Sequence, residues 1–526
     1  MFVRINAVLC LLAASLPGVT FAADSARTVV QRSLAAVSAG RDIRTIKSIR
    51  TSTHTVTFDI QQNDHTGAPY YTAFEQAIMT DDLAGHRSLA EVVLAPTTNG
   101  PERRRVVLRT REVMQTKRIG GSAPQDPIVD LPPPSWELEN PLRALLLADA
   151  AADLEREPDA MLHEALQQVV RFRHGTNGVR LFIDAATGLP SATEMTFALH
   201  HVSADDVAWN PWGDIVDRTE FMNWYTVEGI RYPSQSDTSR NGERYRATTV
   251  SEAHLDVALD PTAFTPPPAA VARAADLRRQ DIDELPLGGA VPYAPDPKLP
   301  IAEIAPGIVQ IPGSWYATVI RQPDGIVVID APISAGYSRQ VLDEAQRRFP
   351  GLPIKALVTS TSFFWHIAGV REYAARGIPI YVRDRNVAIV RAMLAAPHKL
   401  FPDDLARQPQ VRPEIRAVSQ RTQIGTGANA LVLFPILQAT QPMLMTYVAD
   451  ARLIHTGEMV QPLGPGGALL YPESLLEIAY AVRDARIDAT RMIGMHMSPT
   501  PWSRIAEALR AAGIATGDGG SRRSSH

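Results

Sequence analysis

The chain has 526 residues, of which 45% are hydrophobic and 21% charged, so it is long enough to bury more than one apolar core. These values argue against a single domain and indicate two or more. The formal net charge of -4 gives no global electrostatic attraction to nucleic acid or to an anionic membrane surface, so neither is expected as a partner.

Residues 1–22 have the features of a secretory signal peptide. A basic start precedes the apolar segment 7–16, which is too short to span a bilayer, and residues 20–22 form a small-x-small cleavage site. The mature chain is therefore expected to begin near Ala23 and to be periplasmic or secreted. The single cysteine, Cys10, lies inside this segment, so any metal in the mature protein must be held by nitrogen and oxygen atoms. No later segment reaches membrane-spanning length.

Residues 23–262 are predicted to form a β-rich domain that begins with a helix at 25–40. Strand-like segments rich in β-branched residues follow at 53–60, 106–116, 168–173, 179–183, 192–201, 219–227 and 245–250. The Asn-Gly pairs at 177–178 and 241–242 indicate hairpin turns. A helix at 142–155 interrupts the strands, because an asparagine followed by a proline supplies an N-cap and a first helical residue.

This antiparallel meander is similar in pattern to the half-barrel of periplasmic lipoprotein carriers, whose concave face takes acyl chains. The alternative is a β domain that only caps the second domain. Two roles are open for the tryptophans Trp209, Trp212 and Trp224. They form either a surface on which a ligand stacks or a set of core and domain-contact residues.

Residues 263–300 are rich in proline and are predicted to be the linker between two domains. Repeated prolines cannot sustain a long helix or a central strand, although a short helix is expected between residues 269 and 284. At the far end, residues 516–526 are glycine, serine and arginine without an apolar pattern, and we expect them to be disordered.

Residues 301–515 alternate strands with helices, which is typical of a layered α/β arrangement. Strands are predicted at 307–311, 315–321, 325–330, 356–360, 378–382, 430–436, 443–448, 453–457 and 491–494. Helices are predicted at 337–349, 368–376, 473–486 and 501–512.

The loop after the strand at 356–360 carries the most informative motif. It reads Thr361-x-Phe363-x-Trp365-His366, with the strand 326–330 upstream and a Gly-Met-His sequence ending at His496 downstream. The arrangement resembles the metallo-β-lactamase superfamily, whose members carry His-x-His-x-Asp-His in this loop. The resemblance implies an αββα sandwich and metal-dependent hydrolysis for residues 301–515, but only the last histidine of the loop motif is present.

The resemblance also implies where the other metal ligands would stand. The third histidine falls within 438–440, where the chain has Gln, Ala and Thr, and the bridging aspartate is replaced by Glu458. The last histidine matches His496. Asp330 occupies the position of an aspartate that the superfamily keeps.

The ligand positions that remain predict a smaller metal site, in which His366, Glu458 and His496 hold a single zinc ion. Glu458 and His366 would be the catalytic residues for a small-molecule substrate. Structural roles near this site are expected for Asp330, Thr361 and Trp365, and also for His455. An unperturbed imidazole pKa predicts loss of activity below about pH 6.

The alternative is a protein without metal that keeps the fold and binds a small apolar or acyl ligand. In that case His366 and His496 are hydrogen-bonded interior histidines. Ser360, Thr361 and Ser362 offer hydroxyl groups near His366, but no Gly-x-Ser-x-Gly sequence surrounds them. The sequence does not identify the substrate.

Overall fold

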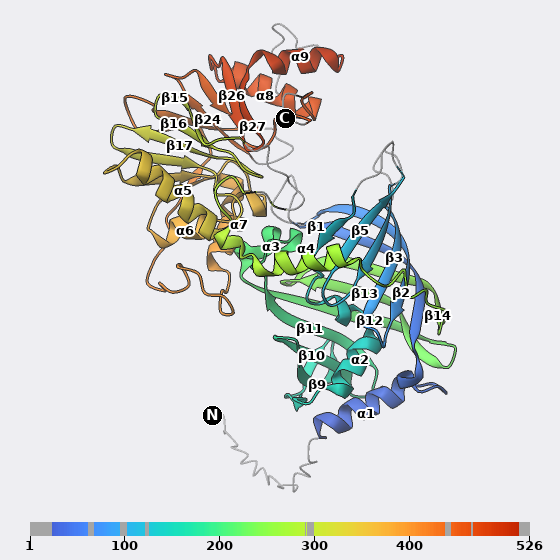
Figure 1. Cartoon of the computed structure of the whole chain (residues 1–526). Helices are drawn as coiled ribbons and strands as arrows, with labels where there is room; N and C mark the ends of the chain where they lie inside the picture. Colours follow the sequence, from blue (N-terminus) through green and yellow to red (C-terminus); the bar gives the residue numbers. More distant parts are fainter. Residues whose placement is uncertain are drawn as a thin grey trace, which may run out of the picture.

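The computed structural model describes residues 24–60, 68–94, 103–120, 126–289, 291, 299–436, 443–463 and 467–514. The expected signal peptide, the expected tail and positions 438–440 lie outside the described residues, as do residues 290 and 292–298 of the proline-rich segment. Three sheets organise the described chain, one large and antiparallel, and two smaller ones (Figure 1). This mixed architecture with a large antiparallel sheet agrees with the prediction from sequence.

The large sheet has fourteen strands, and its spatial order is β6-β5-β4-β3-β2-β1-β14-β13-β12-β11-β10-β9-β7, with β8 also paired to β9. Its strands are β1 Ser48–Asp59, β2 Tyr71–Asp82, β3 Arg87–Leu94, β4 Arg103–Arg109, β5 Met114–Ile119, β6 Ile128–Asp130, β7 Glu155–Arg156, β8 Ala160–Leu162, β9 Ala165–His174, β10 Asn177–Asp184, β11 Pro190–Ala198, β12 Asp214–Val227, β13 Ile230–Arg240 and β14 Glu243–Leu255.

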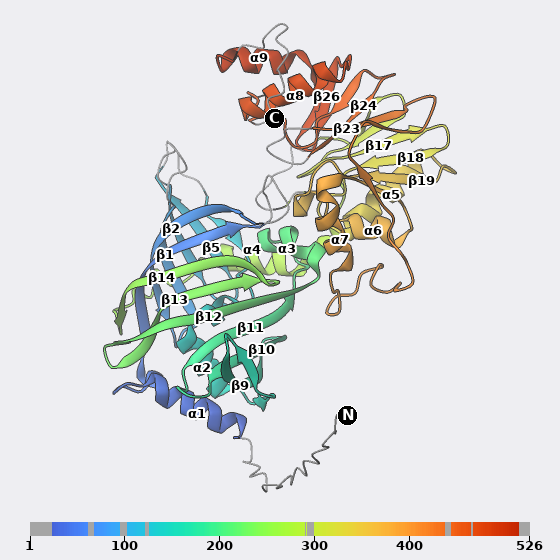
Figure 2. The same ribbon diagram turned by 180° about the vertical axis from the view of Figure 1, so that it is seen from behind.

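Helices α1 (Ala26–Val37) and α2 (Pro141–Ala150) pack their apolar sides against this sheet. Asn140 caps α2 with a proline in the first turn, as the sequence predicted, and the side chain of Ser25 caps α1. Figures 1 and 2 show the sheet curving around α2, with α1 at the end away from the smaller sheets. Helix α2 ends at Ala150, earlier than predicted, because residues 155–156 pair with β9.

Two predicted strand boundaries were wrong. The segment 106–116 forms two strands, β4 and β5, because the hydroxyl of Thr110 accepts hydrogen bonds from the backbone N–H groups of Glu112 and Val113 and closes a turn. The hairpin of β9 and β10 turns at Gly175-Thr176, where the glycine has φ 60°, and the Asn-Gly pair at 177–178 begins the next strand.

The interior of the large sheet contains arginine side chains in two different situations. Arg240 is buried and donates to both carboxylate oxygens of Asp217 at 2.7 and 2.8 Å, and Ser135 donates to the same carboxylate. Arg109 on β4 is partly buried and has neither a hydrogen bond nor an ion pair to any residue that the structure describes. Burial lowers the pKa of Arg109, because it disfavours the charged guanidinium.

The remaining strands form a seven-stranded sheet in the order β15 to β21 and a six-stranded sheet in the order β22 to β27. The first has β15 Ala302–Ala305, β16 Ile308–Ile311, β17 Ala317–Gln322, β18 Gly325–Ile329, β19 Ile354–Val358, β20 Ile380–Arg383 and β21 Ile415–Val418. The second has β22 Thr422–Ile424, β23 Leu431–Pro435, β24 Leu444–Val448, β25 Leu453–His455, β26 Arg491–Gly494 and β27 Met497–Pro501.

Apolar clusters fill the spaces beside and between these two sheets. One cluster joins residues of both sheets, including Val327 and Leu433. A second lies between the seven-stranded sheet and the helices α5 Ala335–Arg348, α6 Val370–Ala375 and α7 Val387–Ala395. A third lies between the six-stranded sheet and the helices α8 Pro472–Asp484 and α9 Ser503–Ala511. Among the described residues, no helix combines the length and the apolar character needed to cross a membrane.

The two parts of the chain meet at helix α3 (Ala204–Trp209) and the residues that follow it. The ring of Phe364 packs edge-on against Trp209 and Trp212, with ring centroids 5.3 and 5.1 Å apart. Asp214 accepts hydrogen bonds from the backbone N–H groups of Lys399 and Leu400. Trp209 and Trp212 are therefore core and contact residues, which is one of the two roles that the sequence left open.

The proline-rich segment contains helix α4 (Pro268–Arg279), close to the short helix that the sequence predicted. Ala270 and Ala274 of α4 pack against Val113 near β5, and Val129 and Leu131 lie beside them. Figure 1 shows α3 and α4 between the large sheet and the smaller sheets.

Candidate metal centre

Two buried residues fix the start of the loop that carries the expected site. Asp330 follows β18 with φ 67°, and its carboxylate accepts hydrogen bonds from the backbone N–H and the hydroxyl of Ser360 at 2.7 and 2.8 Å. Burial raises the pKa of Asp330 to about 7, against the effect of these two hydrogen bonds. Asp330 therefore holds the start of this loop. The Ser360 hydroxyl is buried and donates to this carboxylate.

The loop continues into a short 3-10 helix, Phe364–His366, that orients His366. On the other sheet, Gly457 has φ 64°, and its carbonyl accepts a hydrogen bond from the backbone N–H of Met495. That bond joins the residue before Glu458 to the residue before His496. The loops after β19, β25 and β26 therefore converge at one place.

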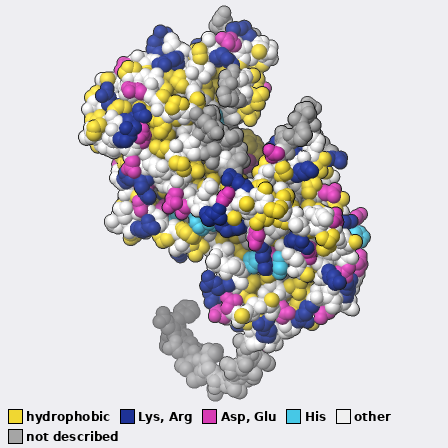
Figure 3. All heavy atoms as spheres, viewed as in Figure 1, with side chains coloured by type: hydrophobic (Ala, Val, Ile, Leu, Met, Phe, Trp, Pro, Cys, Tyr) yellow, Lys and Arg dark blue, Asp and Glu magenta, His cyan; other side chains and the backbone are white. Residues whose placement is uncertain are grey.

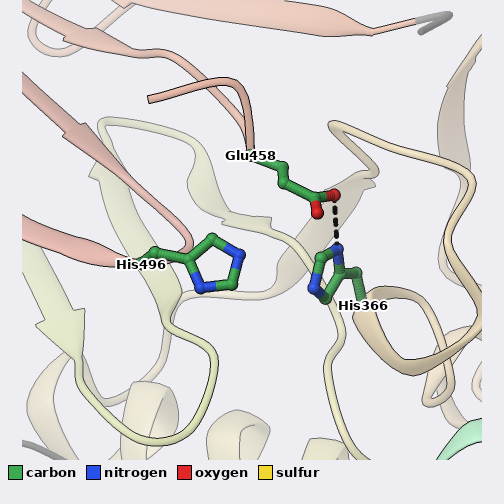
Figure 4. Close-up of side chains that lie close together, drawn as sticks. All are labelled: His366, Glu458 and His496. Carbon is green, nitrogen blue, oxygen red and sulfur yellow. Dashed lines mark ion pairs between the residues drawn. The ribbon is translucent and has the colours of Figure 1, made fainter. Parts of the chain in front are cut away.

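Figure 4 shows His366, Glu458 and His496 around a common centre. Each offers one ligand atom, and these three atoms lie within 4.8 Å of one another. His366 Nδ1 is 2.9 Å from Glu458 Oε2, and the two imidazole centroids are 5.4 Å apart. The two sheets thus bring together residues that are far apart in the sequence.

Burial shapes the protonation of all three side chains. It raises the pKa of Glu458 to about 8, although the charge of His496 and a hydrogen bond from Thr361 oppose this change. It lowers the pKa of His366 well below the usual range, and with the charge of His366 it lowers that of His496 to about 4. Both histidines are therefore neutral at pH 7, and the expected loss of activity below pH 6 through imidazole protonation does not follow.

The nitrogen atoms of these histidines lack hydrogen-bond partners. Within the described part of the chain, neither ring nitrogen of His366 forms a hydrogen bond, and Nε2 of His496 forms none either. All three nitrogen atoms are buried. The short contact between His366 and Glu458 does not have hydrogen-bond alignment. A buried imidazole without partners is costly, so the expectation of hydrogen-bonded interior histidines is not met. Two neutral imidazoles and a carboxylate fit a zinc ion.

Aromatic rings surround His366 on several sides. Trp315, Phe363 and Trp365 have ring centroids 5.5, 5.7 and 5.8 Å from that of His366, and Trp315 stacks on Trp365. The hydroxyl of Thr361 lies 3.5 Å from the carboxylate of Glu458. The sequence motif places Phe363 and Trp365 here, but it contains no signal for Trp315, which comes from the loop before β17.

His455 lies outside the group of three. Its Nδ1 accepts a hydrogen bond from the backbone N–H of Gly457, and its Nε2 is 3.7 Å from Asp330. Burial lowers the pKa of His455 to about 3, so it is neutral. The contact with Asp330 agrees with the structural role expected from sequence.

Several solved structures are similar to part of this chain. They include metallo-β-lactamases. The one from Pontibacter korlensis is 13% identical with a TM-score of 0.31, and the match covers 40% of this chain and 98% of that protein. The one from Hirschia baltica is 13% identical with a TM-score of 0.29, covering 40% and 96%. A stereoselective inverting sec-alkylsulfatase from Pseudomonas sp. is 17% identical with a TM-score of 0.31, covering 40% of each chain.

No protein-family model and no curated protein sequence matches the chain. The TM-scores of the similar structures are too low to carry an argument about activity.

Proposed function

We propose that the chain is a metallo-β-lactamase-like hydrolase with a reduced site for one zinc ion, held by His366, Glu458 and His496. The observation that carries this proposal is the convergence of three buried ligand atoms within 4.8 Å, with imidazole nitrogens that lack hydrogen-bond partners. The proposed arrangement of residues 301–515 is the αββα sandwich. The support for this arrangement is that one apolar cluster lies between the two sheets and another lies between each sheet and its helices.

Each side chain has a defined task in this proposal. His366 and His496 bind as neutral imidazoles, and Glu458 binds after losing its proton. When bound, zinc supplies a Lewis acid that lowers the pKa of a coordinated water. Thr361 donates to Glu458 and restricts its carboxylate. Phe363 and Trp365 occupy the space of the missing ligands, and their rings offer no atoms to bind a second ion.

The second candidate is a protein without metal that binds a small apolar or acyl ligand. The aromatic rings of Trp315, Phe363 and Trp365 favour an apolar ligand at the same place. The large sheet offers a second place for such a ligand. We propose that this sheet is a half-barrel of the lipoprotein-carrier type, whose concave face would bind the ligand. Metal content separates this candidate from the hydrolase.

Metal analysis of the purified protein, after dialysis against roughly micromolar zinc, tests the proposal. We expect about one equivalent in the wild type and less than about a tenth in His366→Ala, Glu458→Gln and His496→Ala. His398→Ala is the matched control, because it also removes a largely buried imidazole, whose partners are Asp403 and the carbonyl of Pro211 and not residues of this group. Two equivalents would contradict a single-ion site, and a wild type without zinc would favour the second candidate.

We further propose that the protein is exported, with cleavage of the signal peptide near Ala23. The support is the order of basic, apolar and small residues in segment 1–22. The intact mass of protein recovered from the periplasm or the medium tests this proposal. A mass that still includes Met1 would contradict it.

A further inference from the structure

A cavity of about 790 Å³ lies where the large sheet meets the segment 400–401 of the second half of the chain. Its walls also include the turn between β9 and β10, the segment 131–137 and the end of α4. It shares no lining residue with the His366, Glu458 and His496 group. Figure 3 shows histidine and basic side chains together on this face of the molecule, near the meeting of the two parts.

The one carboxylate in the cavity wall already has cationic and hydrogen-bonding neighbours. Glu137 has no exposed surface, and its carboxylate contacts Arg111 Nε at 3.0 Å, His174 Nε2 at 2.9 Å and His86 Nδ1 at 2.7 Å. Burial alone would raise the pKa of Glu137, but hydrogen bonds and charge from His174 and Arg111 lower it to about 2. Glu137 is therefore a fixed anion whose charge its own neighbours compensate.

A second guanidinium in the wall has no such compensation. Arg278, in the last turn of α4, donates to the backbone carbonyl of Glu112 at 2.8 Å and forms no ion pair with any described residue. His200 and His201 lie beside it in the wall, and burial lowers the pKa of both, so they add no charge at pH 7. The lining thus carries an excess of positive charge.

The rest of the wall is apolar and partly exposed. Leu400 and Phe401 are 49% and 51% exposed, and the ring of Phe401 stacks on His200 at 3.9 Å between centroids. Trp136 and three consecutive prolines, 132–134, complete this side. Adjacent exposed apolar side chains at a cavity are a common feature of ligand sites. The volume lies within the range of pockets that hold small organic molecules.

A smaller cavity of about 330 Å³ next to it differs in charge. Its arginines are paired, since Arg371 contacts Asp403 at 2.5 and 3.0 Å and Arg339 contacts Asp404 at 3.0 Å. Two further acids, Asp281 and Asp283, also line it, and it shares Phe401 with the larger cavity. Only the larger cavity combines an unpaired guanidinium with an exposed aromatic ring.

We propose that the larger cavity binds an organic anion, with its acidic group at Arg278 and its apolar body against Phe401. The pairing is physically favourable because a guanidinium binds an anionic group strongly and a flat apolar body covers the exposed ring. This site is independent of zinc, so the ligand binds whether or not the metal centre is loaded.

Two fluorescent probes with the same ring system test the proposal. One is 8-anilinonaphthalene-1-sulfonate, an aromatic anion, and the other is N-phenyl-1-naphthylamine, which lacks the sulfonate. We expect one saturable site for the sulfonate and about tenfold weaker binding of the neutral probe. Arg278→Gln should weaken the sulfonate about tenfold, and Phe401→Ala should weaken both probes.

Matched controls exclude a general effect of charge or of apolar surface. Arg279→Gln removes a neighbouring exposed arginine of the same helix turn, and Phe74→Ala removes a phenylalanine that is 55% exposed on β2. Neither residue lines the cavity, so neither change should alter binding. Equal affinity for both probes, or equal effects of Arg278→Gln and Arg279→Gln, would overturn the proposal.

Discussion

Ser360 donates two hydrogen bonds to Asp330, one from its backbone N–H and one from its hydroxyl, and both residues are buried. The hydroxyl bond matters because Asp330 has no exposed surface. Ser360→Ala is expected to lower the free energy of unfolding by about 1–3 kcal/mol, since a buried oxygen loses a donor. Urea unfolding measures this change.

A buried threonine provides the control for that substitution. Thr318 has a hydroxyl without a hydrogen-bond partner among the described residues. Thr318→Val should therefore leave the free energy of unfolding unchanged or raise it slightly. Equal losses in the two variants would mean that the bond from Ser360 to Asp330 has no special weight.

Zinc binding should release a proton from Glu458. Its pKa of about 8 means that the carboxyl group is protonated at pH 7 in the metal-free protein, whereas a ligand carboxylate is ionised. We therefore expect about one proton released per zinc ion near pH 6.5, and almost none above about pH 9. Affinity should rise with pH up to about pH 8 and then level off.

Isothermal titration in buffers of different ionisation enthalpy measures the proton count. Glu458→Gln is the control, because it keeps the side-chain shape and removes the titrating group. It should bind zinc more weakly and without proton release. No proton release by the wild type near pH 6.5 would contradict the protonated state of Glu458.

The two arginines inside the large sheet should respond in opposite directions to removal of their charge. Arg240→Met leaves Asp217 buried without its bidentate partner, which is expected to cost about 3–5 kcal/mol. Arg109→Met removes a charge without a partner and should leave stability unchanged or raise it. Thermal unfolding of both variants measures the difference. A loss in Arg109→Met as large as in Arg240→Met would show that Arg109 is paired.

The proposed division into domains 23–262 and 301–515 predicts the sites of limited proteolysis. First cuts are expected between Pro266 and Pro300, because a proline-rich sequence has few backbone N–H groups to protect it. Cuts within α4 are not expected, since Ala270 and Ala274 are buried against the large sheet. Mass spectrometry of early fragments locates the cuts. A first cut inside 24–262 or 301–514 would contradict this boundary.

Local signals in the sequence predicted much of the fold. Most of the features that were not predicted depend on contacts between residues that are far apart in the sequence. The Asn140-Pro141 pair located α2, a helical pattern located α1, and β-branched alternation located most strands of the second half. The split at Thr110 was missed because β-branched residues stand on both sides of the polar residues 109–112, where the turn depends on a hydrogen bond to the Thr110 side chain. The arginine run at 103–105 belongs to β4, which is paired on both sides, and no local signal reports such pairing.

The same distinction applies to the site. His366, Glu458 and His496 were found because they keep positions of a known motif, and the structure brings them together. Trp315 was missed because its contact with His366 depends on how β17 packs against the loop. The cavity near Arg278 was missed for the same reason, since its walls come from six stretches that are far apart in the sequence.

In the proposed site a single ion lies between His366, Glu458 and His496. Anomalous X-ray diffraction at the zinc absorption edge, from crystals grown with zinc, locates bound ions directly. We predict one anomalous peak per chain within about 2.0–2.2 Å of a nitrogen of each histidine and an oxygen of Glu458. Two peaks in this region, or no peak between these three side chains, would contradict the account.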